Sequence, residues 1–281
     1  MKIRTLFYII GASLIMSSCQ TYVFYQVYEV RPVDEPNNKT AELFFEDDNC
    51  KIAYDLWANG GDIGFDFYNK TDRKIYVNLN ESNFILNGFA YDYFKNRTFT
   101  TTKNKSTSVS NQSSAAVAVT GVNNYNNIQT NQVKSSSSGI LGSSVGYAIS
   151  IIEDSIICIP PKTTKRISEY SINNTLIRNC DLFRYPRTKE IKTKTYTTEE
   201  SPIVFSNRIT YNIDGSSELV ENEFFVSEIT NYPSYDFFGK TYTEYCGQKS
   251  SYTDLEYYIF KDNNMFYIEY KKEMEGGFWK H

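Results

Sequence analysis

Side chains able to carry out chemistry are few in this chain and poorly placed for it. The only histidine, His281, is the last of the 281 residues. A Ser-His-acid or Cys-His arrangement needs an imidazole held against the nucleophile, which a terminal residue supplies badly. Zinc catalysis lacks ligands, and no glycine-rich stretch ends in the Lys-Ser or Lys-Thr of a phosphate-binding loop. The sequence therefore predicts a protein that is not an enzyme and has neither metal nor cofactor.

Carboxylates gather in two acidic clusters, Glu46-Asp47-Asp48 and Glu199-Glu200. Glycosidase chemistry needs two carboxyls that face one sugar, and the sequence does not show which carboxyls face each other. The turn Glu46-Asp47-Asp48-Asn49 offers oxygen ligands to calcium, but it lacks the spacing and the glycine of an EF-hand loop. We interpret both clusters as exposed acidic turns.

Four cysteines follow residue 19, and an even number in an oxidising compartment allows two disulfides. They are Cys50, Cys158, Cys180 and Cys246. Three pairings are open, and proximity in sequence makes Cys158 with Cys180 the first pair to test. None of the four lies in a CxxC spacing, which argues against zinc and redox motifs. Buried free thiols are the alternative interpretation.

Aromatic residues are abundant, with 24 tyrosines and 19 phenylalanines. They favour strands, and the helix formers Ala and Leu are sparse, so the composition predicts an all-β chain. Exposed tyrosine and tryptophan also stack on sugars. Trp57 and Trp279 are therefore candidate glycan contacts, although aromatic residues on strands mostly pack one face of a sheet.

The first nineteen residues have the organisation of an export signal. Lys2 and Arg4 precede an apolar run, Leu6 to Met16, that is too short to span a bilayer, and small residues lead to Cys19. This pattern resembles a bacterial lipoprotein signal, with Met16 where the family prefers leucine. The resemblance implies removal of residues 1–18 and acylation of Cys19, so that the N-terminal lipid holds the chain on a membrane. An ordinary secretory signal is the alternative.

The expected location is the cell envelope. Residues 20–23 lack the acidic cluster that resembles the surface-export signal of Bacteroidetes-type lipoproteins. We therefore expect an anchor in the outer membrane that faces the periplasm. The net charge of −4 and the lack of a basic patch argue against nucleic acid as a partner.

Most of the chain is predicted to form strands. Residues 19–40 carry prolines and asparagines and are interpreted as a tether, followed by a β domain over residues 41–281. Residues 51–68 alternate around Asn59-Gly60-Gly61, which predicts a hairpin. Residues 98–144 are rich in Ser, Thr and Asn and too poor in apolar groups to offset their ordering entropy, so a flexible insertion is expected. A final hairpin is predicted from the strands 252–260 and 265–270.

Two short motifs carry a resemblance to a fold. The stretch from Ile159 through Pro160-Pro161 to Ile167 resembles an edge of immunoglobulin-like sandwiches in secreted and envelope proteins, and Asn69-Lys70-Thr71 resembles an earlier part of the same fold. The resemblance implies an antiparallel immunoglobulin-like β-sandwich with a long low-complexity insertion. A second β subdomain from about residue 181 is the alternative.

Together these features resemble uncharacterised Bacteroidetes-type envelope lipoproteins. The expected function is a non-catalytic structural or protein-interaction role, in which sheet edges or the 98–144 arm bind another envelope protein. A glycan-binding envelope module is the alternative.

Overall fold

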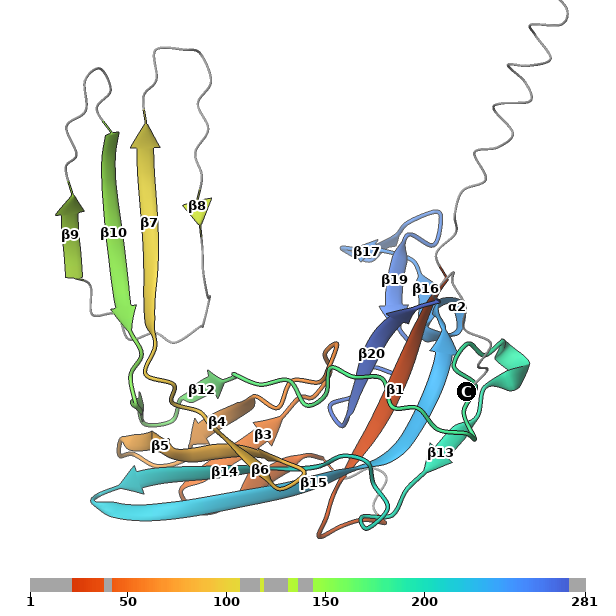
Figure 1. The fold of residues 1–281 in the computed structure, drawn as a ribbon, viewed down its shortest axis with the longest axis horizontal. Helices are drawn as coiled ribbons and strands as arrows, with labels where there is room; N and C mark the ends of the chain where they lie inside the picture. Colours follow the sequence, from red (N-terminus) through yellow and green to blue (C-terminus); the bar gives the residue numbers. More distant parts are fainter. Residues whose placement is uncertain (1–21, 38–41, 107–116, 119–130, 136–143, 273–281) are drawn as a thin grey trace, which may run out of the picture.

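A computed structural model describes residues 22–37, 42–106, 117–118, 131–135 and 144–272. Antiparallel strands dominate these residues, and the prediction of an all-β chain is confirmed (Figure 1). The described residues contain one short α-helix, α2 (Ser234–Phe237), and one 3-10 turn, η1 (Thr188–Glu190).

A long, curled sheet forms the body of the molecule (Figure 1). Its main strand order is β11-β5-β14-β15-β1-β20, with β6 paired to β5 and β13 paired to β15. The strands are β1 (Val23–Pro32), β5 (Ile75–Leu86), β6 (Phe89–Asp92), β11 (Ile156–Ile159), β13 (Thr193–Thr195), β14 (Val204–Ile213), β15 (Ser216–Pro233) and β20 (Met265–Lys271). The 18-residue β15 pairs with β14 along its first part and with β1 along its last. Since β14, β15 and β20 share this sheet with β1 and β5, the alternative of a separate subdomain from about residue 181 is wrong.

A smaller sheet of order β12-β4-β3-β2 packs on one face of the body. Its strands are β2 (Phe44–Glu46), β3 (Cys50–Tyr54), β4 (Phe65–Asn69) and β12 (Thr164–Ile167). Alternate side chains of β3 and β4 are buried, as expected for a sheet with one buried face. The ring of Tyr54 lies 5.1 Å from that of Phe224, and Phe67 lies 5.5 Å from Tyr211. The core therefore lies between two sheets, and the hairpin predicted for residues 51–68 is confirmed by the pairing of β3 with β4.

The two motifs that suggested a sandwich meet where the chain passes between the sheets. One passage joins β4 to β5, and the other joins β11 to β12 through Pro160-Pro161. The fully buried side-chain amide of Asn69 donates to the carbonyl of Arg73 at 2.6 Å and to those of Ile159 and Pro160 at 3.1 and 3.2 Å. One asparagine thus connects both passages.

The prediction of a tether over residues 19–40 is wrong for residues 23–32, which form β1 between β15 and β20. Five consecutive side chains, from Phe24 to Tyr28, are buried. Both faces of this strand are covered, so the alternation that identifies a half-buried strand is missing.

An arm of four strands projects from the body where β7 begins and β10 ends (Figure 1). It consists of β7 (Thr98–Ser106), β8 (Val117–Ala118), β9 (Asn131–Ser135) and β10 (Ser144–Ile152). β7 and β10 pair in register from Thr98 with Ile152 to Ser106 with Ser144. The expected flexible insertion is therefore wrong for residues 98–106, because backbone hydrogen bonds form a ladder whatever the side chains. Residues 107–116, 119–130 and 136–143 lie outside the described residues.

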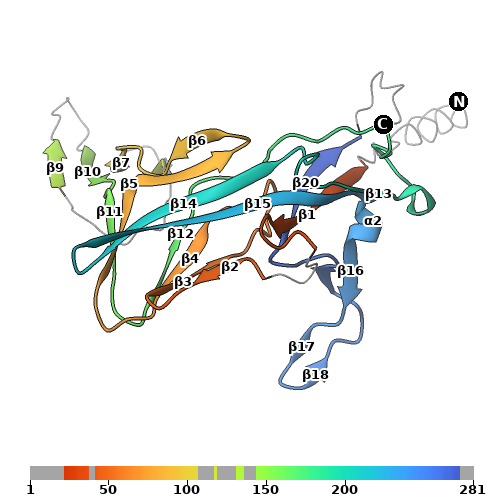
Figure 2. The same ribbon diagram turned by 90° about the horizontal axis from the view of Figure 1, so that it is seen from below.

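The final hairpin predicted from residues 252–260 and 265–270 is wrong as well. β20 pairs with β1, whereas β19 (Leu255–Tyr258) pairs with β16 (Phe238–Thr241). With β17 (Glu244–Tyr245) and β18 (Gln248–Lys249), these strands form an extension that leaves the body after α2 (Figure 2).

Candidate functional site

A cluster of aromatic rings fixes the root of this extension near the start of β1. Tyr25 on β1 stacks on the fully buried Phe237 of α2, with ring centroids 4.0 Å apart. The ring of Trp57 lies 5.3 Å from that of Tyr258 and 5.1 Å from that of Tyr267. Each such aromatic pair contributes about 1 kcal/mol beyond the burial of its area. The extension therefore leaves the body from a rigid base.

Trp57, a candidate glycan contact, has a packing role in this cluster. Its side chain is half-buried, and its indole Nε1 lies inside the cluster without a hydrogen-bond partner. A sugar platform needs an open aromatic face, and the exposed tyrosines further along the extension offer that better. The glycan contact at Trp57 stays a prediction, and Trp279 lies outside the described residues.

Residues 238–259, which we call the tyrosine hairpin, form two consecutive two-stranded ribbons (Figure 2). Cys246 and Gly247 turn the outer ribbon with φ values of 50° and 79°. Positive φ at both central residues is the geometry of a type I′ turn, which suits a tight hairpin. In the inner ribbon the ring of Tyr257 lies over Gly239, where a Cβ atom would overlap it.

Large apolar side chains cover the tyrosine hairpin, although none of its side chains between residues 240 and 259 is buried. Of the sixteen exposed large hydrophobic side chains in the described part of the chain, seven lie on the tyrosine hairpin and an eighth, Tyr235, lies just before it on α2. They are Tyr235, Tyr242, Tyr245, Tyr252, Leu255, Tyr257, Tyr258 and Ile259. Because a two-stranded ribbon is marginally stable in water, an apolar surface on one is typical of an interaction site.

Four of the charged side chains beside these tyrosines form two ion pairs. Lys240 Nζ lies 3.4 Å from Glu256 Oε1, and Lys249 Nζ lies 3.8 Å from Glu244 Oε2. Tyrosine offers a large, rigid contact area and a hydroxyl at a low cost in side-chain entropy. The surface is therefore suited to binding through aromatic contact and hydroxyl hydrogen bonds.

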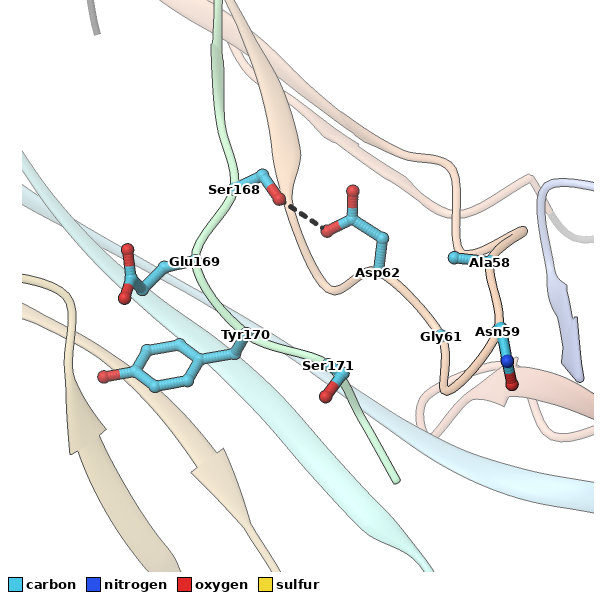
Figure 3. A pocket seen from close by; sticks show the side chains of 8 residues that line it. All are labelled: Ala58, Asn59, Gly61, Asp62, Ser168, Glu169, Tyr170 and Ser171. Atoms are coloured by element: carbon cyan, nitrogen blue, oxygen red, sulfur yellow. Dashed lines mark hydrogen bonds between the residues drawn. The ribbon is translucent and has the colours of Figure 1, made fainter. Parts of the chain in front are cut away.

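A shallow hollow of about 300 Å³ lies between residues 58–62 and 168–171 (Figure 3). Asp62 lines it and accepts a hydrogen bond from Ser168 Oγ at 2.8 Å. Glu169 also lines it, but its side chain points to the other side of the 168–171 segment (Figure 3). The two carboxylates do not face each other across the hollow, as a glycosidase pair would.

An ion cluster holds the base of the arm to the body. Arg97, directly before β7, donates to both carboxylate oxygens of Glu169 at 2.6 and 2.8 Å, and to Glu153, directly after β10, at 2.5 Å. Lys95 Nζ lies 2.9 Å from Glu169. The carboxylate side chains of Glu153 and Glu169 are only 6% and 7% exposed. The cluster therefore ties both strands of the arm to the segment after β12.

The two buried carboxyls of this cluster titrate below their ordinary range. Burial raises the pKa of Glu153 and of Glu169, but the hydrogen bonds and charge of Arg97 outweigh it, and the net pKa of each is lowered. Lys95 adds to the lowering at Glu169. Both side chains are therefore charged at neutral pH.

The acidic turn at Glu46-Asp47-Asp48-Asn49 is satisfied by the protein itself. Asp47 Oδ1 accepts hydrogen bonds from the backbone N–H groups of Asn49 and Cys50 at 2.8 and 2.6 Å, and Oδ2 accepts one from the Tyr211 hydroxyl at 2.9 Å. Within the described ranges, no group of three or more His, Cys, Asp or Glu side chains is placed to hold a metal ion.

All four cysteines that were considered for disulfides are free thiols in the structure, Cys158 and Cys180 included. Cys50 is buried, Cys158 is half-buried, and Cys180 and Cys246 are exposed. Burial, together with the neighbouring Asp47 carboxylate, raises the pKa of the Cys50 thiol to about 12. The thiols therefore differ widely in access and in reactivity.

We expect thiol labelling of the native protein at pH 8 to reach Cys180 and Cys246 within minutes, Cys158 more slowly, and Cys50 only after unfolding. The thiolate is the reactive form, and Cys50 is both buried and protonated at this pH. Mass spectrometry of alkylated peptides measures the order. Equal rates at Cys50 and Cys246, or pairs that label only after reduction, would contradict this arrangement.

Cys19, the predicted acylation site, lies outside the described residues. Over the residues that the structure does describe, no helix has the length and apolar character needed to cross a membrane. Comparisons with protein-family models, curated proteins and solved structures find no match to this chain.

Sequence reasoning missed the tyrosine hairpin as a surface. The alternation of residues 252–260 predicts a strand, but neither alternate set of side chains is uniformly apolar, as a buried face requires. Large side chains occupy both alternate sets of positions, with Tyr252 and Tyr258 in one set and Leu255 and Tyr257 in the other. That mixture was the available signal for an exposed ribbon.

Proposed function

We propose that this chain is a non-catalytic envelope protein that binds another protein through the tyrosine hairpin. The observation that carries the proposal is the concentration of exposed large hydrophobic side chains on a ribbon without buried residues. Tyrosine is among the residues that contribute most to binding at protein interfaces. A rigid aromatic root at Tyr25 and Phe237 presents this surface in one orientation, which lowers the entropy cost of association.

The proposal includes a lipid anchor on Cys19, after removal of residues 1–18, in the outer membrane and facing the periplasm. Its support is the basic start, the short apolar run and the small residues before Cys19. The resemblance to Bacteroidetes-type envelope lipoproteins rests on the same residues.

For the fold, we propose a relationship to the immunoglobulin-like sandwich. The support is the packing of two antiparallel sheets through Tyr54 and Phe224, together with the two passages that Asn69 connects. The 18-residue β15 and the projecting arm extend that plan.

A glycan-binding module is the second candidate. Open tyrosine faces at Tyr245, 81% exposed, and Tyr252, 68% exposed, favour it, because such rings stack on sugars. Here too the tyrosine hairpin would be the binding surface, and the same variants distinguish the two candidates.

The test is a triple substitution on the tyrosine hairpin, Tyr245→Ser, Tyr252→Ser and Tyr257→Ser. We expect capture of a protein partner from envelope extract to fall at least about thirtyfold, since loss of one interface hot spot costs about 2 kcal/mol or more. The matched control is Tyr76→Ser, Phe89→Ser and Leu219→Ser, which removes three exposed apolar side chains elsewhere. The purified partner is then titrated against both variants.

Equal binding by both variants would contradict the assignment of the tyrosine hairpin. Binding of a polysaccharide, but of no protein, that the hairpin substitutions abolish would select the glycan module. Deletion of residues 107–143 separates a contribution of the arm from that of the hairpin.

A further inference from the structure

The start of β1 leaves very little chain between the folded body and the proposed lipid. Only residues 20–22 lie between Cys19 and Val23. Tyr22 is already attached to the body, because its carbonyl accepts a hydrogen bond from Lys272 N at 3.0 Å. A chain spans at most about 3.6 Å per residue, so the Cα of Cys19 lies within about 11 Å of that of Tyr22. An acylated Cys19 would therefore hold this end of the molecule at the membrane surface.

This end of the molecule is basic. We call it the anchor face: Tyr22, Arg184, Tyr185, Arg187, Lys189, Lys192, Lys271 and Lys272. Its acidic neighbours Glu190 and Asp236 are engaged locally, Glu190 by the backbone N–H of Arg187 at 2.9 Å and Asp236 by the hydroxyl of Thr188 at 2.8 Å. Glu269 lies on β20, and Glu273 and Glu275 follow Lys272 in the sequence. Among the described residues, six cations and three carboxylates thus lie at this end, an excess of positive charge in a chain whose net charge is −4.

Ring contacts hold the anchor face together. The ring of Tyr185 lies 5.2 Å from Phe24 and 6.2 Å from Tyr270, and the Tyr270 hydroxyl donates to the Arg184 carbonyl at 2.5 Å. Lys272 Nζ lies 5.8 Å from the Tyr185 ring. The 184–192 loop, the end of β20 and the start of β1 therefore form one surface, and both views place the loop and α2 at the same end of the molecule (Figures 1 and 2).

We propose that the anchor face binds the anionic headgroups of the membrane in which Cys19 is acylated, an inference that rests on the proposed lipid anchor. The short link brings the face to the surface, and its cations complement the negative charge there. Tyr22, 59% exposed, has the amphipathic side chain that occupies the headgroup layer. A second contact of this kind fixes the orientation of the body, which one lipid attachment point does not. The 18-residue β15 then runs from the end that carries the arm toward the membrane, where Pro233 pairs with Phe24.

The experiment compares lysine acetylation in the full lipidated protein reconstituted in phosphatidylglycerol/phosphatidylethanolamine vesicles, in phosphatidylcholine vesicles and in detergent. In the anionic vesicles at low salt we expect Lys189, Lys192, Lys271 and Lys272 to react about fivefold more slowly than in phosphatidylcholine. High salt should reduce this difference, since it screens the attraction. The internal controls are Lys74 and Lys162 at the opposite end of the sheet, which should react equally in all three.

A charge-reversed variant, Lys189→Glu with Lys192→Glu, should lose the protection of Lys271 and Lys272. The matched control, Lys74→Glu with Lys162→Glu, should keep it. Equal reactivity of the anchor-face lysines in anionic and neutral vesicles would overturn the proposal while leaving the anchor intact. Detection of an N-terminal peptide with an unmodified Cys19 would instead overturn the lipid anchor, and with it the inference that the short link to Tyr22 holds this end at the membrane.

Discussion

Replacement of Arg97 by methionine is expected to lower the free energy of unfolding by about 3–5 kcal/mol at neutral pH. The side chain neutralises two carboxylates, Glu153 and Glu169, that are 6% and 7% exposed. Without it, Lys95 remains as a partner of Glu169, but Glu153 keeps only the backbone N–H groups of residues 95 and 97. A buried carboxylate deprived of its cation is costly because its charge has left water.

The pH dependence of this loss has a defined sign. In the wild type the folded-state pKa of Glu153 and Glu169 is lowered, so their contribution is present above the unfolded pKa of about 4.3 and is lost as the pH falls through the folded value. In the variant, burial without Arg97 raises the carboxyl pKa, and the variant gains relative stability as the pH falls. The difference between the two proteins should therefore shrink from pH 7 to pH 4.

Urea unfolding at several pH values measures this difference. The control is Arg73→Met, which removes an arginine from the exposed ion pair with Asp214 and should change stability by less than about 1 kcal/mol. A loss at Arg97 that is constant with pH would show that packing, and not charge, holds the base of the arm.

Replacement of Gln26 by leucine is expected to cost about 3–5 kcal/mol, because it leaves several buried polar groups without partners. Gln26 is fully buried on β1. Its amide nitrogen donates to the Ile177 carbonyl at 2.9 Å and to Asn231 Oδ1 at 2.8 Å, and its amide oxygen accepts from the Ile177 N–H at 2.8 Å and from the Tyr28 hydroxyl. A leucine of similar size fills the space but satisfies none of these groups.

Thermal and urea unfolding check this value, and hydrogen exchange at Ile177 reports whether the loop has left the sheet. Tyr28→Phe removes a single hydrogen bond and should cost about 1 kcal/mol, and the exposed Gln248→Leu should cost almost nothing. A Gln26→Leu protein as stable as wild type would mean that these partners find other hydrogen bonds.

Composition and local alternation are sufficient to predict an all-β chain and the hairpin over residues 51–68. Asn87-Gly88 and Asp214-Gly215 form tight turns with positive φ at both residues, which asparagine, aspartate and glycine tolerate. The loop expected around Asp214-Gly215 was longer, because alternation does not show how far β14 and β15 extend. Alternation over residues 51–68 identified β3 and β4, since one face is buried and the other is exposed. These are local properties, and they survive whatever the rest of the chain does.

Strand pairing and burial, by contrast, depend on contacts between distant parts of the chain. The sequence of β1 does not alternate regularly between apolar and polar residues, because both faces of this strand are buried. Its side chains pack in two separate hydrophobic clusters, which form only in the folded molecule. β19 pairs with β16, and β20 pairs with β1. The periodicity of a strand specifies which face each side chain lies on, but it does not specify which strand is the partner. Whether a tyrosine packs a core or projects into solvent depends on what lies opposite it, and no run of residues along one strand contains that information.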